Sequence, residues 1–323
     1  MEKKNSNLHN AKVAKKDEFY TQLSDIEKEL CYYKDHFKDK IVLCNCNDAI
    51  HGRFAKYFAL NFEFLGLRKL ICTSYGEGEE NGKICVYKGD KNSNGVPDID
   101  EWEQYELNGK GDFRSEECIK LLEEADIVVT NPPFSLFREF IAQLIQYDKK
   151  FLIIGNVNAI TYKEVFPLIK NNQMWLGVSI KSGDRAFNVP EDYPLEAAGC
   201  GVDENGNKFI RVKGVRWFTN LDNDKRHEKL ELYKKYNEID NPKYDNYDAI
   251  EVSKTADIPI DYDGIMGVPI TFLDKYCPEQ FEIIGITENA NYLIPLHIDG
   301  CEKYDRPYLN GKRMYSRLLI KSK

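Results

Sequence analysis

The sequence predicts an α/β protein with a doubly wound, mostly parallel sheet in residues 1–220 and a mixed α+β region in residues 221–323. In the first region, short apolar runs alternate with helical patterns, which is typical of strands joined by crossover helices. After Asn220 this alternation stops, and the chain mixes charged residues, short strands, proline and tyrosine. A chain of 323 residues can form one large domain or two ordinary ones, and we expect a boundary near residue 221.

Composition excludes several classes of protein. With 42% hydrophobic and 30% charged residues, the chain is globular rather than disordered or fibrous. It has no apolar run of about 18 residues, and its lysine-rich start leads into polar residues, so we expect a cytoplasmic protein without membrane spans or secretion signal. The nine scattered cysteines include no Cys-x-x-Cys pair, which predicts reduced thiols and no zinc site.

The charge distribution bears on possible partners. A net charge of -8 argues weakly against a nucleic-acid partner, because phosphate-binding proteins usually carry a basic excess. Basic residues nevertheless gather in four places, and each place taken alone is more simply explained as a solvated surface: residues 12–16, 208–216, 225–229 and 312–323. The sequence therefore allows a basic face on a protein that is acidic overall.

The first elements are a helix and a strand. A helix should open at Ser24, whose hydroxyl can cap it while Glu27 reaches back three residues later. Apolar residues at helical spacing, from Ile26 and Leu30 to Tyr33 and Phe37, give it one buried face. The apolar run at residues 40–46 then predicts the first strand.

The remaining elements follow in order from the same patterns. We expect helices at residues 54–62, 115–124, 135–147, 162–171 and 222–240, and strands at 69–74, 126–130, 151–155, 174–179 and 215–219. Residues 76–111 form a polar insertion, predicted to be a surface hairpin.

The hairpin insertion contains a second pattern. Residues 90–101 fit the spacing of a calcium loop, with oxygen-bearing side chains at Asp90, Asn92, Asn94 and Glu101 and glycine at the sixth position. The preceding residues 82–88 indicate a strand rather than a helix, and Asn-Gly is also ordinary turn chemistry. We therefore favour a hairpin tip and keep a calcium site as the alternative.

The strongest local signal is the tetrapeptide Asn131-Pro132-Pro133-Phe134, which follows the buried strand 126–130 and precedes a helix. In open α/β sheets the ligand site lies beyond the carboxyl ends of the strands. Proline fixes the backbone and leaves its carbonyl available, Asn131 offers an amide oxygen, and Phe134 offers a flat apolar ring. If Asn131 and the Pro132 carbonyl each accept one N–H of a ring amine, the nitrogen lone pair becomes available for attack.

This motif is similar to the catalytic motif of S-adenosylmethionine-dependent amino methyltransferases, and the wider chain resembles the EcoRI-type adenine-specific DNA methyltransferases. Six blocks in one order carry the resemblance: residues 17–22, 42–46, 111–115, 126–137, 151–164 and 175–178. The resemblance implies a Rossmann-like class I methyltransferase fold, with catalysis in residues 1–220 and target recognition in residues 221–323. It further implies methyl transfer to N6 of an adenine flipped out of duplex DNA.

The resemblance also assigns cofactor residues. Tyr20 and Thr21 match the motif that contacts the methionine part of S-adenosylmethionine, and Asp112 and Phe113 match the motif that meets its adenine. The chain departs from the family pattern after the first strand, where residues 45–52 lack the Gly-x-Gly turn and the second strand ends without a carboxylate. Asn45 and Asp48 are the polar residues that could replace those contacts, with Asn131 completing the set.

Further residues are assigned to base and DNA contacts. Phe187 stands where related enzymes place an aromatic against the flipped base, with Trp217 as the alternative and core packing as the simpler explanation for either. Sequence readout needs side chains that reach groove edges, and arginine suits guanine and phosphate alike. The candidates are Arg185, Arg211, Arg216 and Arg226.

Two other functions remain as alternatives. Asn-Pro-Pro followed by an aromatic residue also serves methylation of guanine in RNA and of glutamine in proteins, although those enzymes usually keep the glycine-rich first loop. A non-catalytic DNA-binding relative is favoured by the irregular first loop and disfavoured by the intact tetrapeptide. For the main function we expect a monomer that needs no metal and acts in a restriction-modification pair or as an orphan, phage-type modification enzyme.

Overall fold

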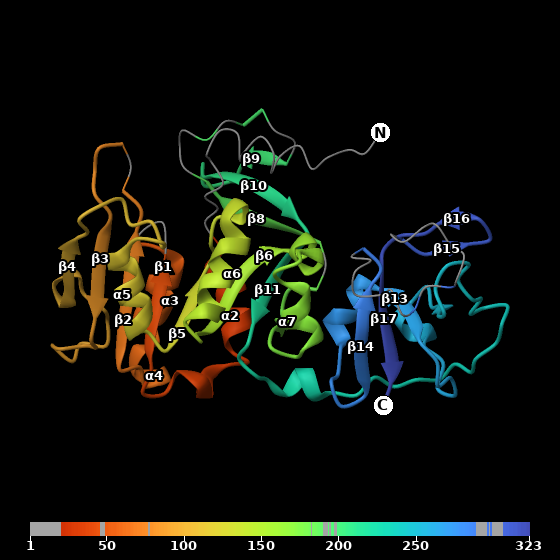
Figure 1. The fold of residues 1–323 in the computed structure, drawn as a ribbon. Coiled ribbons are helices and arrows are strands. Elements are labelled where there is room, and N and C mark those ends of the chain that lie inside the picture. Colours follow the sequence, from red (N-terminus) through yellow and green to blue (C-terminus); the bar gives the residue numbers. More distant parts are fainter. Residues whose placement is uncertain are drawn as a thin grey trace. The chain divides into compact units, whose positions relative to one another are not determined.

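The computed structural model describes residues 21–45, 49–76, 78–181, 183–189, 193, 195–196, 199–288, 296, 298 and 306–323 (Figure 1). The chain divides into two compact units. The first comprises the residues up to Ala159 together with Gly177–Leu221, and the second comprises Ile160–Leu176 with Asp222–Lys323. The segment 160–176, which the sequence analysis placed in the first region, thus groups with the second unit. Within the described ranges, no helix is both long and apolar enough to span a bilayer.

The first unit contains a large mixed sheet with helices packed on its strands. Its helices are α2 (Leu23–Leu30), η1 (Lys34–Phe37), α3 (Arg53–Leu60), α4 (Phe62–Leu65), η2 (Ile99–Glu101), α5 (Glu116–Glu124), η3 (Phe134–Leu136), α6 (Phe137–Gln146) and η4 (Val157–Thr161), the last of which runs into the second unit. Its strands are β1 (Ile41–Asn45), β2 (Lys69–Ser74), β3 (Lys83–Tyr87), β4 (Trp102–Glu106), β5 (Ile127–Thr130), β6 (Lys150–Asn156), β8 (Asp184–Asn188), β9 (Cys200–Val202), β10 (Lys208–Lys213) and β11 (Val215–Thr219).

Seven strands of the large sheet belong to this unit, in the order β4-β3-β2-β1-β5-β6-β11. The sheet's eighth strand is the two-residue β7 (Trp175–Leu176). The four central strands β2, β1, β5 and β6 are parallel, whereas β3, β4 and β11 pair antiparallel with their neighbours. Helix α3 packs on β2, α5 on β1 and α6 on β6. The predicted α/β class with a large sheet is confirmed, and the insertion forms an antiparallel hairpin, β3–β4, at the sheet edge.

The sheet order creates a switch point between β1 and β5. From β1 the chain proceeds outward to β2 on one side, and it later returns to lay β5 on the other side of β1. Crossover connections leave in opposite directions at such a point, so the carboxyl ends of the two strands open a crevice where ligands bind in α/β sheets. The sequence motif at residues 131–134 follows β5 directly.

A smaller antiparallel sheet, β8-β10-β9, belongs to the same unit. Its inner face contributes Phe187 and Ile210, paired across β8 and β10, to the core cluster of the unit. Gln22, directly before α2, donates to Asn188 at 2.5 Å and so ties β8 to the start of the chain's described part. The small sheet is therefore packed on the large one through shared core residues.

Two expected boundaries of secondary-structure elements were wrong. The first helix begins at Leu23 with Gln22 as its N-cap, and the capping box predicted for Ser24 and Glu27 does not form, although the predicted apolar face is buried. The strand predicted at residues 174–179 shrinks to β7. The strand does not continue past Leu176 because the next N–H groups bond to a buried side chain. Glu29 accepts the N–H groups of Val178 and Ser179 at 2.8 and 2.6 Å. Burial raises the pKa of Glu29.

The second unit is built on a four-stranded sheet. Its elements are α7 (Phe166–Lys170), η5 (Asp224–His227), β12 (Ile250–Glu251), η6 (Thr255–Asp257), β13 (Met266–Pro269), η7 (Ile270–Lys275), β14 (Phe281–Ile286), β15 (Tyr308–Leu309), β16 (Lys312–Arg313) and β17 (Arg317–Ser322). The sheet order is β12-β13-β17-β14, and β15 pairs with β16 in a separate two-stranded ribbon.

The helix predicted at residues 222–240 is wrong, because only the single turn η5 forms. The backbone after it bonds to other segments instead of to itself. Leu230 exchanges two hydrogen bonds with the Gln280 side chain, at 2.7 and 2.9 Å, and Lys234 accepts from the N–H of Ile260 at 2.9 Å. Tertiary partners thus replace the helical ladder in a segment whose exposed charges offered no apolar stripe to bury.

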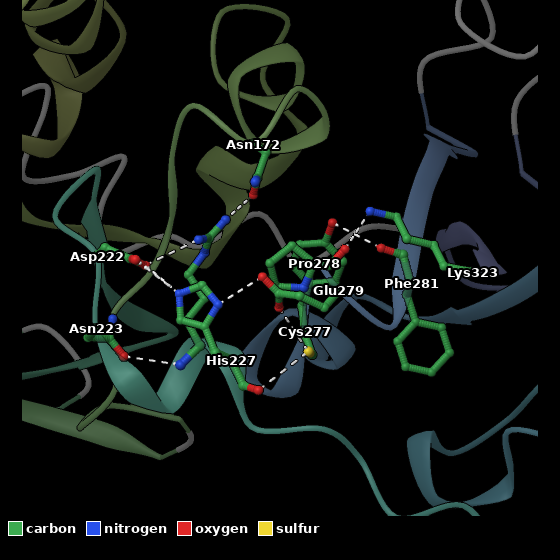
Figure 2. A network of polar contacts seen from close by, with 11 residues as sticks. Asn172, Asp222, Asn223, His227, Cys277, Pro278, Glu279, Phe281 and Lys323 are labelled. Atoms are coloured by element: carbon green, nitrogen blue, oxygen red, sulfur yellow. Dashed lines mark hydrogen bonds and ion pairs between the residues drawn. The ribbon is translucent and has the colours of Figure 1, made fainter.

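The turn η5 is held by a network of polar contacts in this unit (Figure 2). His227 lies between two carboxylates, with Nε2 2.9 Å from Oδ1 of Asp222 and Nδ1 2.9 Å from Oε1 of Glu279. The hydrogen bonds to Asp222 and then to Glu279 raise the pKa of His227 above its ordinary value. Protonated His227 can donate to both carboxylates at once, whereas the neutral ring can donate to only one.

We therefore expect the stability of this unit to fall as pH rises. The folded pKa of His227 exceeds the unfolded pKa of about 6.5, so the stabilisation is complete below that pH and is lost as pH rises through the folded value. Urea midpoints measured from pH 5.5 to 9 test this. His227→Gln, which keeps an amide donor but cannot titrate, should flatten the dependence; an equally steep curve in that variant would contradict the assignment.

Candidate active site

The predicted catalytic tetrapeptide lies at the carboxyl end of β5, beside the end of β1. The hydroxyl of Thr130, the last residue of β5, donates to the carbonyl of Asn45, the last residue of β1. Asn131 follows Thr130 directly, and its Oδ1 atom is buried. The sheet therefore brings Asn45 and residues 131–134 together at the switch point, as the sequence analysis requires for one shared site.

The segment with Asp112 and Phe113 lies at the carboxyl end of β2, the other neighbour of β1. Gly76, two residues after β2, donates to the carbonyl of Lys110 at 2.8 Å. Gly111 has φ of +82°, and a Cβ there would lie 2.6 Å from the carbonyl oxygen of Ser74, so this close approach requires glycine. The ring of Phe113 packs edge-on against Phe140 of α6, with centroids 5.1 Å apart.

Asp112 is held by an arginine that the sequence analysis did not single out. Arg114 donates to both carboxylate oxygens of Asp112, Nε to Oδ1 at 2.9 Å and Nη2 to Oδ2 at 2.7 Å, and its Nη1 reaches Glu139 of α6 at 2.7 Å. The hydrogen bond from Arg114 lowers the pKa of Asp112. The Asp-x-Arg spacing in the sequence could have indicated this contact, because an arginine two residues after an aspartate can donate to both of its carboxylate oxygens.

Two residues predicted to bind the cofactor have buried side-chain oxygens. Thr21 is 3% exposed, and the side-chain oxygens of Thr21 and Asn45 are buried without a hydrogen-bond partner among the described residues. Buried polar atoms in native structures are normally satisfied, so each needs a ligand, water or another partner. Tyr20 and Asp48, the other predicted cofactor residues at these positions, lie outside the described residues.

The aromatic residues assigned to the target base lie against the core. Phe134 is partly buried and packs on the core cluster of the first unit, to which Phe187 and Trp217 belong. Phe187 on β8 is 2% exposed and Trp217 on β11 is fully buried. Core packing accounts for the burial of both rings, and stacking of Phe187 on a flipped base stays a prediction.

Of the arginines predicted to contact DNA, three belong to the first unit. Arg211 on β10 is exposed, with its guanidinium carbon 5.7 Å from the centroid of Phe209. Arg185 on β8 is half-buried, with Nε 4.0 Å from a carboxylate oxygen of Asp25. Arg216 is 5% exposed and donates to the carbonyls of Val215 and Lys181. The surroundings of Arg216 favour a structural role, and those of Arg211 favour a contact with an external partner.

The fourth, Arg226, lies in the polar network of the second unit. Its side chain is 9% exposed, with the guanidinium 3.8 Å from the ring centroid of Trp175. It donates to Asp222 at 3.2 Å and to Asn172 (Figure 2). Stacking, ion pair and hydrogen bond together favour a structural role for Arg226 over readout of DNA.

In the hairpin insertion, the side chains of the calcium-like loop bind the loop itself. Glu101 accepts the N–H groups of Lys91 and Asp98 at 2.8 and 3.0 Å, and Asp90 accepts that of Gly95 at 2.7 Å. Asn92 and Asn94 donate their amides to Asp98. The described residues include no group of three or more His, Cys, Asp or Glu suited to a metal ion. These contacts are those of a closed hairpin loop.

The chain is similar to known proteins over nearly its whole length. The family described as "Adenine-specific methyltransferase EcoRI" matches residues 7–323. The Type II methyltransferase M.EcoRI of Escherichia coli is 52% identical to the chain over 99% of this chain and 97% of its own length. The Type II methyltransferases M.MgeORF184P of Mycoplasma genitalium and M.MpnI of Mycoplasma pneumoniae are each 38% identical, over 97% and 98% of this chain and 98% of their own lengths. No solved structure matches the chain. The full-length match and the tetrapeptide at the switch point together place the chain in the EcoRI family of adenine-specific methyltransferases.

Proposed function

We propose that the protein transfers a methyl group from S-adenosylmethionine to N6 of an adenine flipped out of duplex DNA, at a specific sequence. The observation that carries this proposal is the position of Asn131-Pro132-Pro133-Phe134 after β5, beside Asn45 at the switch point of the sheet. Family membership supports the adenine substrate. The activity fits a cytoplasmic monomer that works in a restriction-modification pair or as an orphan modification enzyme.

The residues at the carboxyl ends of β1 and β2 fit the cofactor. The buried oxygens of Thr21 and Asn45 offer acceptors for its polar groups, and the sequence motifs add Tyr20 and Asp48 as predicted cofactor contacts. The ionised carboxylate of Asp112, held in place by Arg114, suits the exocyclic amine of an adenine, and Phe113 offers a ring beside it. The bound cofactor supplies a methyl group on a sulfonium, already activated for transfer, so no metal is required.

Asn131 and the prolines prepare the nucleophile. The N6 amine of adenine is a weak nucleophile because its lone pair is delocalised into the ring. The Asn131 Oδ1 atom and the Pro132 carbonyl accept its two N–H groups, and this arrangement favours a tetrahedral nitrogen with a directed lone pair. Proline donates no backbone hydrogen bond and fixes φ, so Pro132 and Pro133 hold the acceptor carbonyl in place. Phe134 lies against the ring of the base, and Phe187 is the proposed second face.

Two other functions are compatible with the same motif. Methylation of guanine in RNA or of glutamine in proteins would use the same acceptors on a different planar amine. A relative that binds DNA without catalysis would keep the fold and lose the cofactor. The buried side-chain oxygens of Thr21 and Asn45, two residues predicted to bind the cofactor, favour a protein that still binds a polar cofactor.

Incubation of the protein with methyl-labelled S-adenosylmethionine and duplex DNA tests the proposal. We expect label in N6-methyladenine after digestion of the DNA, with unchanged rate in excess chelator, and sequencing of the product should show one flanking sequence. Label in guanine of added RNA or in glutamine would replace the proposal by the first alternative. Absence of cofactor binding in equilibrium dialysis would leave only the non-catalytic relative.

A further inference from the structure

The C-terminal part of the second unit carries a rigid basic hairpin. Strands β15 and β16 pair through Tyr308 with Arg313 and Leu309 with Lys312, and Asn310-Gly311 connects them. Both connecting residues have positive φ, +50° and +77°, which is the type I′ geometry that matches the twist of a two-stranded ribbon. The hairpin is therefore a formed element rather than an irregular loop.

A single carboxylate holds the tip. Asp245 accepts the N–H groups of Asn310 and Gly311 at 3.1 and 2.7 Å, so both backbone donors of the turn are bonded to one side chain. The strand before the turn is fixed as well, because Tyr308 exchanges hydrogen bonds at 2.8 Å with the Asn246 side chain and the Asp245 N–H. The fold therefore orders the tip before any partner binds, and this lowers the entropic cost of binding.

The tip projects into open space. Asn310, Gly311, Lys312 and Arg313 are all exposed. A Cβ placed on Gly311 would have no atom within 4 Å. Tyr315, shortly after β16, is 78% exposed. The hairpin therefore offers its end, rather than a face, to a partner.

The positive charge of the hairpin and the residues around it favours a negatively charged partner. Residues 306–323 contain six lysines and arginines and no aspartate or glutamate, in a chain whose net charge is -8. Within the unit, Arg317 pairs with Glu251, Arg306 pairs with Glu288, and Lys323 donates to the carbonyl of Pro278. The exposed cations of the hairpin are Lys312 and Arg313, and a concentrated positive charge on a preformed projection suits a polyanion.

The ribbon geometry fits the major groove of DNA. Adjacent residues of a strand point to opposite faces, so Lys312 and Arg313 face opposite sides of the hairpin. The major groove, about 12 Å wide, admits a two-stranded ribbon, and phosphates line both of its walls. At the end of the hairpin, Asn310 carries an amide, the group that pairs bidentately with adenine in that groove.

We propose that the β15–β16 hairpin enters the major groove of the substrate DNA tip first, with Lys312 and Arg313 on phosphates of opposite strands and Asn310 on a base edge. This inference rests on the proposed function, since it assumes that duplex DNA is the substrate. It adds the element of the second unit that contacts DNA and separates its positioning residues from its reading residue.

The test is the salt dependence of binding to a short duplex of arbitrary sequence. Each phosphate contact contributes about 0.9 to the slope of log K against log salt, so Lys312→Ala with Arg313→Ala should lower the slope by about 2. Lys321→Ala, which removes an exposed cation of β17 in the same unit, is the matched control and should leave the slope unchanged. Equal slopes for the double variant and the native protein would overturn the proposal.

Two further variants separate geometry from charge. Asp245→Ala removes a negative charge, so charge alone predicts tighter DNA binding, whereas loss of the ordered tip predicts weaker binding, by a few-fold or more. Asn310→Gly keeps the type I′ turn and should relax the preferred methylation sequence at one position without changing the slope. Tighter binding by the Asp245 variant would contradict the hairpin model.

The proposed function and this inference fail in different ways. If the native protein neither methylates nor binds duplex DNA, the function itself is wrong. If it methylates DNA and the hairpin variants, with native thermal melting, methylate and bind as it does, only the hairpin assignment is wrong. A change in sedimentation without a change in DNA binding would assign the hairpin to a protein partner and also overturn the proposal.

Discussion

Asn131→Ala is expected to lower the rate of methyl transfer by on the order of 100-fold or more while binding of S-adenosylmethionine survives. The expected loss is that of one well-placed acceptor in the transition state. Asn131 directly follows β5, whereas the other proposed cofactor acceptors lie before α2 and at the ends of β1 and β2. The two measurements, single-turnover methylation and equilibrium cofactor binding, should therefore separate in this variant.

Asn205→Ala is the matched control for this experiment. Asn205 is an exposed asparagine in the turn between β9 and β10, so its replacement removes the same group at a position outside the tetrapeptide. Asn131→Asp provides a second comparison, since it keeps an acceptor oxygen but adds a charge. Near-native turnover in Asn131→Ala would refute the role of the tetrapeptide, and parallel loss of cofactor binding would indicate collapse of the crevice instead.

The sequence predicted those parts of the fold that follow from local patterns. The strand before Asn131 and the helix after it are apolar in the right period, and the prolines mark the junction, so the location of the tetrapeptide at a strand end was readable. The hairpin insertion was readable from its polar composition. These features depend on residues close together in the chain.

The parts that the sequence could not predict depend on distant partners. Glu29 ends the strand at β7 by binding two N–H groups about 150 residues away, and no local pattern announces such a contact. Gln280 and Ile260 hold residues 228–236 extended where charge and propensity favoured a helix. At the site, Arg216 and Arg226 were chosen for their side-chain chemistry, and tertiary packing buried both.

The second large effect concerns the stability of the second unit, where Glu251→Ala should cost about 3–5 kcal/mol. Glu251 of β12 is 2% exposed and Arg317 of β17 is 8% exposed. They form a forked ion pair, with Arg317 Nη2 2.8 Å from Oε1 and Nε 3.1 Å from Oε2 of Glu251. Removal of the carboxylate leaves the guanidinium buried without its counter-charge, and it also deprives the hydroxyls of Tyr244 and Ser253 of an acceptor.

Urea unfolding combined with amide hydrogen exchange in β13 and β17 measures this loss where it occurs. Glu282→Ala, which removes an exposed carboxylate from β14 of the same sheet, should change the unfolding free energy by less than about 1 kcal/mol. Replacement of both partners, Glu251→Leu with Arg317→Met, should recover part of the loss because no unpaired charge remains buried. Recovery should be incomplete, since Tyr244 and Ser253 still lack their acceptor. A double variant as unstable as Glu251→Ala would show that hydrogen bonding to the carboxylate, rather than the ion pair, dominates at this position.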